Sequence, residues 1–126
     1  MFCQLIGRNR DKFEQTPLTQ FHALDMSDLK NVDAFAKSVN SPIDLLVHSA
    51  GEMPPSLKIT KDGFEQMFAS MVLAPFILTK RLLESGKLKE GCRIIFVSSG
   101  GMYLQKLDLT DLLFQKNPYN KYNGYA

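Results

Sequence analysis

Two short apolar runs, each ending in small and polar residues, constrain the fold of this chain more than any other feature of its sequence. Residues Ile43–Val47 and Arg93–Val97 are almost continuously apolar, which is typical of strands in a parallel sheet that is covered on both faces. The first run leads into His48-Ser49-Ala50-Gly51 and the second into Ser98-Ser99-Gly100-Gly101. Because such small side chains let a ligand approach the backbone, both strand ends are candidate binding sites.

The N-terminal part of the chain adds two strands and a helix to this pattern. Residues Met1–Ile6 and Phe21–Leu24 predict the strands. Apolar residues recur at helical spacing over residues 29–39, and they predict an amphipathic helix with Ser27 as its N-cap.

A longer helix is predicted from about Lys61 to Leu83. Thr60 stands as its N-cap, Ser85-Gly86 closes it, and Pro75 is a candidate position for a bend. Strands that alternate with helices in this way predict an α/β domain with a parallel sheet and right-handed crossovers.

The composition excludes several classes of protein. With 44% hydrophobic and 22% charged residues, the chain has the profile of one soluble globular domain. Fifteen Lys and Arg against thirteen Asp and Glu give a net charge of +2, with no basic run longer than two residues, so no nucleic-acid partner is predicted. The longest apolar run, Met71–Leu78, is far below the ~20 residues that span a bilayer. We therefore expect no membrane span and a cytoplasmic location.

Metal and disulfide chemistry are not indicated either. Cys3 and Cys92 belong to no Cys-x-x-Cys motif or Cys/His cluster, and we expect both to stay reduced. His48 has no second histidine or acidic partner at metal-ligand spacing, so we interpret it as a core histidine with a satisfied ring. The predicted site contains no metal.

Three segments together resemble the short-chain dehydrogenase/reductase superfamily in their order and spacing. They are Val47-His48-Ser49-Ala50-Gly51, Ile95-Phe96-Val97-Ser98-Ser99-Gly100-Gly101-Met102 and Tyr125-Ala126. That superfamily carries an Asn-Asn-Ala-Gly turn after its fourth strand, a Ser after its fifth strand and a Tyr-x-x-x-Lys motif on the next helix. Within it the chain is similar to the animal group called dehydrogenase/reductase member twelve. The resemblance implies a Rossmann-type, doubly wound parallel sheet, with residues 1–126 as a single partial dinucleotide-binding domain.

The resemblance also implies the catalytic residues. Ser99 corresponds to the family's catalytic serine, which hydrogen-bonds the substrate oxygen, and Tyr125 corresponds to the proton donor. A phenol ordinarily loses its proton near pH 10, so the family places positive charge from a Lys and from the oxidised nicotinamide beside it.

Cofactor residues follow from the same resemblance. Arg8 stands at a strand end where NADP-preferring members carry an arginine for the 2′-phosphate, and its alternative interpretation is a solvated turn residue. Asp25 and Met26 match a pair that borders the adenine, although Asp25 is equally suited to a turn before Ser27. Ser49, Ala50 and Gly51 complete the expected cofactor site. NADP is the expected cofactor, with NAD as the alternative.

The chain departs from the family pattern at four places. No counterpart of the family's first strand with its Thr-Gly-x-x-x-Gly-x-Gly loop is present, and the Lys four residues after Tyr125 would fall beyond Ala126. Met71 replaces the helix Asn that holds a relay water, and His48-Ser49 replaces the Asn-Asn pair. We therefore expect an incomplete Rossmann fold, without its first strand and its C-terminal part.

These observations lead to two functional hypotheses. The first is an NADP-preferring oxidoreductase of the carbonyl reductase or alcohol dehydrogenase type, inactive as this fragment alone, whose partner is a small carbonyl or alcohol substrate. The second is a catalytically dead relative that acts as a binding or interaction module. An unrelated flavodoxin-like binding domain would fit the alternation but leaves the interval between Ser99 and Tyr125 unexplained. Homo-oligomer formation by the full-length protein is left open.

Overall fold

Four strands form two parallel pairs in the computed structural model, which describes residues 2–14 and 16–126. The strands are β1 (Cys3–Gly7), β2 (Thr19–Ala23), β3 (Ile43–His48) and β4 (Leu88–Phe96). Each corresponds to a predicted strand with shifted bounds; of the predicted range Met1–Ile6, Met1 lies outside the described residues. The predicted α/β class with parallel pairing is confirmed.

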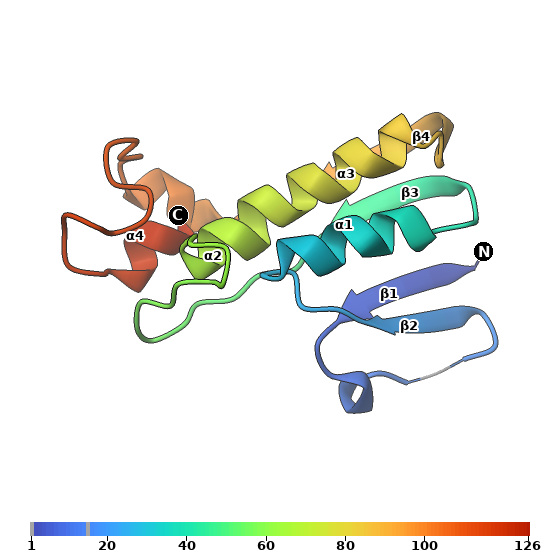
Figure 1. The fold of residues 1–126 in the computed structure, drawn as a ribbon, viewed down its shortest axis with the longest axis horizontal. Helices are drawn as coiled ribbons and strands as arrows, with labels where there is room; N and C mark the ends of the chain where they lie inside the picture. The colour runs from blue at the N-terminus through green and yellow to red at the C-terminus, as the bar shows by residue number, and fades with distance from the viewer. Residues whose placement is uncertain (1, 15) are drawn as a thin grey trace.

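The two pairs lie side by side without a shared hydrogen-bond ladder. Figure 1 shows the spatial order β2, β1, β3, β4, in which β1 and β3 face each other. Within the described ranges, β1 pairs with β2 alone and β3 pairs with β4 alone. This order is that of an incomplete Rossmann sheet.

Helices and helical turns connect the strands. They are η1 (Arg10–Lys12), α1 (Leu29–Ser38), α2 (Gln66–Phe68), the π-helical turn η2 (Ala69–Leu73), α3 (Ala74–Glu84), η3 (Gly100–Leu104) and α4 (Lys121–Tyr125). The prediction of Ser27 as N-cap of the first helix is wrong by one residue. Asp28 accepts the backbone N–H of Asn31 at 3.1 Å, whereas the Ser27 hydroxyl donates to Asp25 at 2.8 Å.

The long helix begins at Gln66 rather than at Lys61, so its predicted start is wrong. Residues 60–63 instead close a turn in which the Gly63 N–H donates to the Thr60 carbonyl at 2.9 Å, and Gly63 adopts a φ of 85°. A left-handed φ suits glycine because it has no β-carbon. The helical run ends at Glu84, one residue after the predicted Leu83; Ser85 is its C-cap, and Gly86 follows with a φ of 65°.

Glu65 is the true cap of the long helix. Its buried carboxylate accepts the backbone N–H groups of Met67 at 3.0 Å and Phe68 at 2.8 Å. These N–H groups belong to the first helical turn and have no partner within the helix, so the carboxylate satisfies them and also interacts favourably with the helix dipole. Pro75 lies inside the continuous helical run, directly after the π-helical turn Ala69–Leu73. Proline has no N–H to donate to the preceding turn, which suits a position where the helical hydrogen-bond pattern changes.

The hydrophobic core lies between α1, α3 and one face of the strands. Its buried residues are Leu24, Val32, Ala36, Val39, Ala74, Leu78 and Leu82, and Leu46 of β3 packs against them. The opposite face of β3 is open, since Leu45 and Val47 are 44% and 46% exposed. In β4, Ile95 and Phe96 are likewise 45% and 58% exposed. The expectation that both strands are covered on both faces is therefore wrong for the described residues, because α1 and α3 both pack on the side of Leu46.

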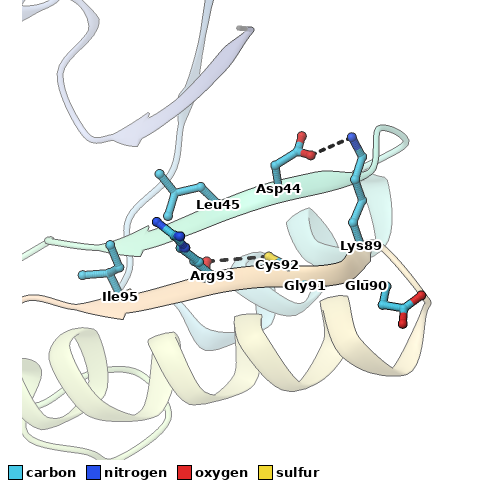
Figure 2. A pocket seen from close by; sticks show the side chains of 8 residues that line it. All are labelled: Asp44, Leu45, Lys89, Glu90, Gly91, Cys92, Arg93 and Ile95. Atoms are coloured by element: carbon cyan, nitrogen blue, oxygen red, sulfur yellow. Dashed lines mark hydrogen bonds and ion pairs between the residues drawn. The ribbon is translucent and has the colours of Figure 1, made fainter.

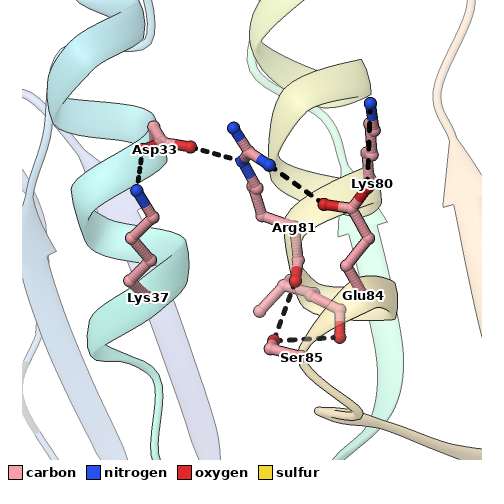
Figure 3. A network of polar contacts seen from close by, with 7 residues as sticks. Asp33, Lys37, Lys80, Arg81, Glu84 and Ser85 are labelled. Atoms are coloured by element: carbon pink, nitrogen blue, oxygen red, sulfur yellow. Dashed lines mark hydrogen bonds and ion pairs between the residues drawn. The ribbon is translucent and has the colours of Figure 1, made fainter.

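Ion pairs join α1 to α3 at the surface (Figure 3). Asp33 of α1 accepts from Lys37 on its own helix and from Arg81 of α3, and Arg81 also donates to Glu84 at 3.0 Å. These hydrogen bonds lower the pKa of the Asp33 carboxyl below its ordinary value. The network links the outer surfaces of the two helices that cover the core.

The helical run Gln66–Glu84 is also long and apolar enough to cross a membrane by length and composition alone. The same test is passed by core helices of soluble proteins, and Met67, Ala69, Ala74, Leu78 and Leu82 of this run are buried inside the protein. The expectation that the chain has no membrane span remains a prediction.

Candidate active site

The candidate site lies at the carboxyl ends of the strands, where the loops that follow β1, β3 and β4 emerge. Arg8 follows β1, the turn Ser49-Ala50-Gly51 follows β3, and Ser99 lies three residues after the end of β4. Strands are parallel within each pair, and Figure 1 shows β1 and β3 pointing the same way, so these segments lie at the same end of both sheets, which is where open α/β sheets bind ligands. The three turn residues are exposed, so their backbone is accessible to a ligand.

Ser99 caps the helical turn η3. Its hydroxyl oxygen accepts the backbone N–H of Gly101 at 3.2 Å, and the residue is half-buried. A serine hydroxyl carries one proton to donate and two lone pairs. With one lone pair occupied by Gly101, the proton remains available for the oxygen of a substrate.

Tyr125 is held in place by the way α4 docks on α2. Asn120 caps α4 by accepting the N–H of Tyr122 at 2.9 Å. Gly124 packs so closely that a β-carbon there would lie 2.5 Å from the Met67 methyl carbon and 3.2 Å from the ring of Phe114. The neighbouring Tyr125 is thereby fixed against the rest of the domain.

The Tyr125 hydroxyl lies beside the turn that follows β3. A β-carbon at Gly51 would be 4.0 Å from that hydroxyl oxygen and 3.9 Å from the Met71 methyl carbon. The structure thus brings together Gly51, Met71 and Tyr125, which are far apart in the sequence. Helix α4 also contacts η3, the turn that Ser99 caps. Met71 presents a thioether where the family pattern has an amide, and a thioether is only a weak hydrogen-bond acceptor.

His48 is a satisfied histidine at the end of β3. Its Nε2 atom lies 2.8 Å from the Thr79 hydroxyl oxygen, and its ring stacks on Phe96 with 4.7 Å between ring centroids. No group of three or more metal-ligating side chains is close enough to bind a metal ion in the part of the chain that the structure describes. Burial lowers the pKa of the His48 imidazole, because a buried site disfavours the charged form.

We expect His48 to make the protein less stable in mild acid. The unfolded chain takes up a proton at this residue near pH 6.5, whereas the folded chain does so only at lower pH, so the free energy of unfolding falls as the pH drops below about 6.5. One group contributes at most about 1.4 kcal/mol per pH unit. Urea denaturation at about pH 7.5 and about pH 5.5 measures the loss, and His48→Gln should reduce it; an unchanged pH dependence in that variant would contradict the assignment.

Arg8 and Glu52 form a pair that sequence patterns do not reveal. Arg8 Nη1 lies 3.2 Å from Glu52 Oε2, and the Arg8 side chain is 58% exposed, so its two predicted roles, phosphate binding and a solvated turn residue, both remain predictions. Glu52 directly follows Gly51, but its partners are distant in sequence and no local motif marks it. It is the site residue that sequence analysis missed.

Asp25 and Met26 occupy the loop after β2. The Asp25 carboxylate accepts both the backbone N–H and the hydroxyl of Ser27 at 2.8 Å, a turn geometry that was one of its two predicted roles. Met26 packs against the core. Their part in adenine binding remains a prediction.

A cavity of about 380 Å³ lies away from this edge, on the open face of β3 and β4 (Figure 2). It is lined by Asp44, Leu45, Lys89, Glu90, Gly91, Cys92, Arg93 and Ile95. An ion pair of 2.7 Å between Asp44 and Lys89 closes one end of it. None of the predicted site residues lines this cavity, so it is separate from the candidate active site.

Comparison with known proteins identifies the family of this chain. The sequence profile of the short chain dehydrogenases matches residues 6–106. The chain belongs to this family. Dehydrogenase/reductase SDR family member 12 of Homo sapiens is 35% identical over 107 residues, which cover 83% of this chain and 34% of that protein. The predicted resemblance to this superfamily and to the member twelve group is confirmed.

Other members of the short chain dehydrogenase family are similar to comparable degrees. Retinol dehydrogenase 13 of Homo sapiens is 34% identical over 82% of this chain and 32% of its own length. A crystal structure of an uncharacterized protein from Mycobacterium paratuberculosis superposes with a TM-score of 0.83 at 29% identity, covering 97% of this chain and 46% of that one. The chain spans about a third of the length of the curated relatives it matches.

Proposed function

We propose that this short chain dehydrogenase is an NADP-preferring oxidoreductase that interconverts a carbonyl compound and an alcohol. The observation that carries the proposal is the position of the Tyr125 hydroxyl, which lies against Gly51 at the sheet edge where Ser99 follows β4. In this proposal, Tyr125 supplies the proton donor, Ser99 supplies a hydroxyl that holds the substrate oxygen, and the turn that contains Gly51 offers an accessible backbone.

The residues at this edge suit a nicotinamide cofactor. The turn Ser49-Ala50-Gly51 is exposed and consists of small residues, so a flat ring can approach its backbone. The guanidinium of Arg8 supplies the planar, permanent positive charge that suits a phosphate. The proposed preference for NADP over NAD rests on Arg8.

The proposed reaction divides two roles between the chain's own hydroxyl groups. When bound, the cofactor supplies or accepts the hydride at the substrate carbon. In reduction, Ser99 donates a hydrogen bond to the carbonyl oxygen, and the Tyr125 hydroxyl transfers its proton to that oxygen, so that the C=O double bond becomes C–O–H. In oxidation Tyr125 takes the proton back. The names of retinol dehydrogenase 13 and polyprenol dehydrogenase support an alcohol as one of the two substrates.

We also propose that a polypeptide of these 126 residues alone does not catalyse turnover. Its sequence contains no Thr-Gly-x-x-x-Gly-x-Gly loop to seat the pyrophosphate and no Lys four residues after Tyr125. A second candidate function, a catalytically inactive binding module, is favoured by Met71, which stands where the family pattern has an Asn and lies beside Gly51, as the Tyr125 hydroxyl does. These two candidates differ in whether turnover appears once the family's missing motifs are supplied.

A chimera tests the proposed function. In human dehydrogenase/reductase SDR family member 12, the segment that matches this chain is replaced by residues 1–126, so that the relative supplies the remaining parts. We expect this chimera to oxidise NADPH in the presence of a panel of aldehydes and ketones. Arg8→Asp should raise the KM for NADPH at least about tenfold, because it exchanges attraction to the 2′-phosphate for repulsion, with little effect on the KM for NADH. Equal effects on both cofactors would contradict NADP preference, and no turnover with either would favour the inactive module.

A further inference from the structure

Glu52 lies at the centre of a polar cluster that joins three parts of the site. Its carboxylate accepts Arg8 Nη1 from the loop after β1 at 3.2 Å, Gln66 Nε2 from α2 at 2.8 Å and Ser70 Oγ from η2 at 3.1 Å. The Glu52 side chain is only 15% exposed, whereas that of Arg8 is 58% exposed. The carboxylate is thus fixed by the helix, and the guanidinium is its solvent-facing partner.

We propose that Glu52 determines cofactor specificity by competing with a 2′-phosphate for Arg8. This inference rests on the proposed function, because it takes Arg8 as the phosphate-binding residue. Two features of the pair support the competition. Gln66 and Ser70 hold the carboxylate in place, so it cannot easily turn away, and Arg8 reaches it through a single nitrogen.

The competition affects only ligands that carry a 2′-phosphate. To bind such a ligand, the Arg8 guanidinium must leave the Glu52 carboxylate and pair with the 2′-phosphate. The Glu52 carboxylate then stays unpaired from Arg8 and repels the phosphate. A ligand without that phosphate leaves the ion pair between Arg8 and Glu52 intact. Glu52 therefore weakens NADP binding without weakening NAD binding, and it sets how strong the preference for NADP can be.

Titration of this chain with two adenosine phosphates tests the inference. The probes are adenosine 2′,5′-bisphosphate and adenosine 5′-monophosphate, with affinities measured by NMR chemical-shift perturbation. Glu52→Gln removes the charge but keeps the shape and one acceptor oxygen. We expect it to tighten bisphosphate binding about 3- to 10-fold and to change monophosphate binding less than about 2-fold. Asp33→Asn is the matched control, since it removes a carboxylate paired with Arg81 on a different surface, and it should change neither affinity.

The double variant Arg8→Gln with Glu52→Gln identifies the route of the effect. It should bind the bisphosphate no more tightly than Arg8→Gln alone, because the competition acts only through Arg8. The inference is overturned if Glu52→Gln leaves the bisphosphate affinity unchanged, if the gain persists without Arg8, or if no chain binds the bisphosphate detectably. Each of these results would leave turnover of the chimera with NADH possible, so failure here is distinct from failure of the proposed oxidoreductase activity.

Discussion

Replacement of Tyr125 by phenylalanine is expected to lower kcat of the chimera by about 10²–10⁴-fold. Phenylalanine keeps the ring that lies against Gly51 but lacks the hydroxyl that exchanges a proton with the substrate oxygen. The KM values for NADPH and substrate should change far less, because the ring still fills its place. Initial rates of NADPH oxidation at saturating substrate measure this effect.

A matched control lies on the same short helix. Tyr122 is three residues before Tyr125 and is mostly exposed, so Tyr122→Phe should leave kcat within about twofold of the parent. Ser99→Ala should also lower kcat, since it removes the donor to the substrate oxygen. Equal rates for the parent and Tyr125→Phe would show that the proton comes from another group.

The largest expected effect on stability is at Leu82. This side chain is 1% exposed in the core between α1 and α3, whereas the adjacent Leu83 is 66% exposed. Leu82→Ala should lower the free energy of unfolding by about 2–5 kcal/mol, because it removes buried apolar contacts and leaves a cavity. Leu83→Ala removes the same atoms from a solvated position and should cost less than about 0.5 kcal/mol.

Urea denaturation monitored by far-UV circular dichroism compares the two leucine variants. Both substitutions lie in the last turns of α3 and change helix propensity equally, so the difference between them reports burial alone. Similar losses of unfolding free energy for the two variants would mean that the Leu83 side chain is buried in solution, for instance against another copy of the chain.

The strands were predictable from the sequence because their signal is local. Nearly continuous apolar residues over Ile43–Val47 and Arg93–Val97 indicate parallel strands whatever lies elsewhere in the chain. Which faces are covered depends on other segments, and α1 and α3 both lie on the side of Leu46. A pattern read from one strand cannot contain that information.

The helix starts show where local signals compete. Thr60 has the right chemistry for an N-cap, but the helix does not begin there. Thr60 and Gly63 close a turn, with Gly63 at a left-handed φ, and Ile59 forms a β-bridge with Glu65. The buried carboxylate of Glu65 then caps the helix five residues later. Helix α4 (Lys121–Tyr125) is too short to show a periodic pattern, so only its family resemblance marked it.

For the candidate site, family spacing located Ser99, Gly51 and Tyr125, and the structure places them at or beside one sheet edge. Their catalytic and cofactor roles remain predictions. Glu52 could not be found in this way, because its role depends on donors that lie 14 to 44 residues away along the chain. Contacts of that range are set by the tertiary fold.

Two consecutive residues of one loop connect the two sides of the candidate site. Gly51 lies beside the Tyr125 hydroxyl, and Glu52, the next residue, pairs with Arg8 in the loop after β1. Glu52 is also held by Gln66 and Ser70 of the long helical run. A substitution that displaces this loop is therefore expected to change proton transfer at Tyr125 and phosphate binding at Arg8 together, even though it alters neither residue.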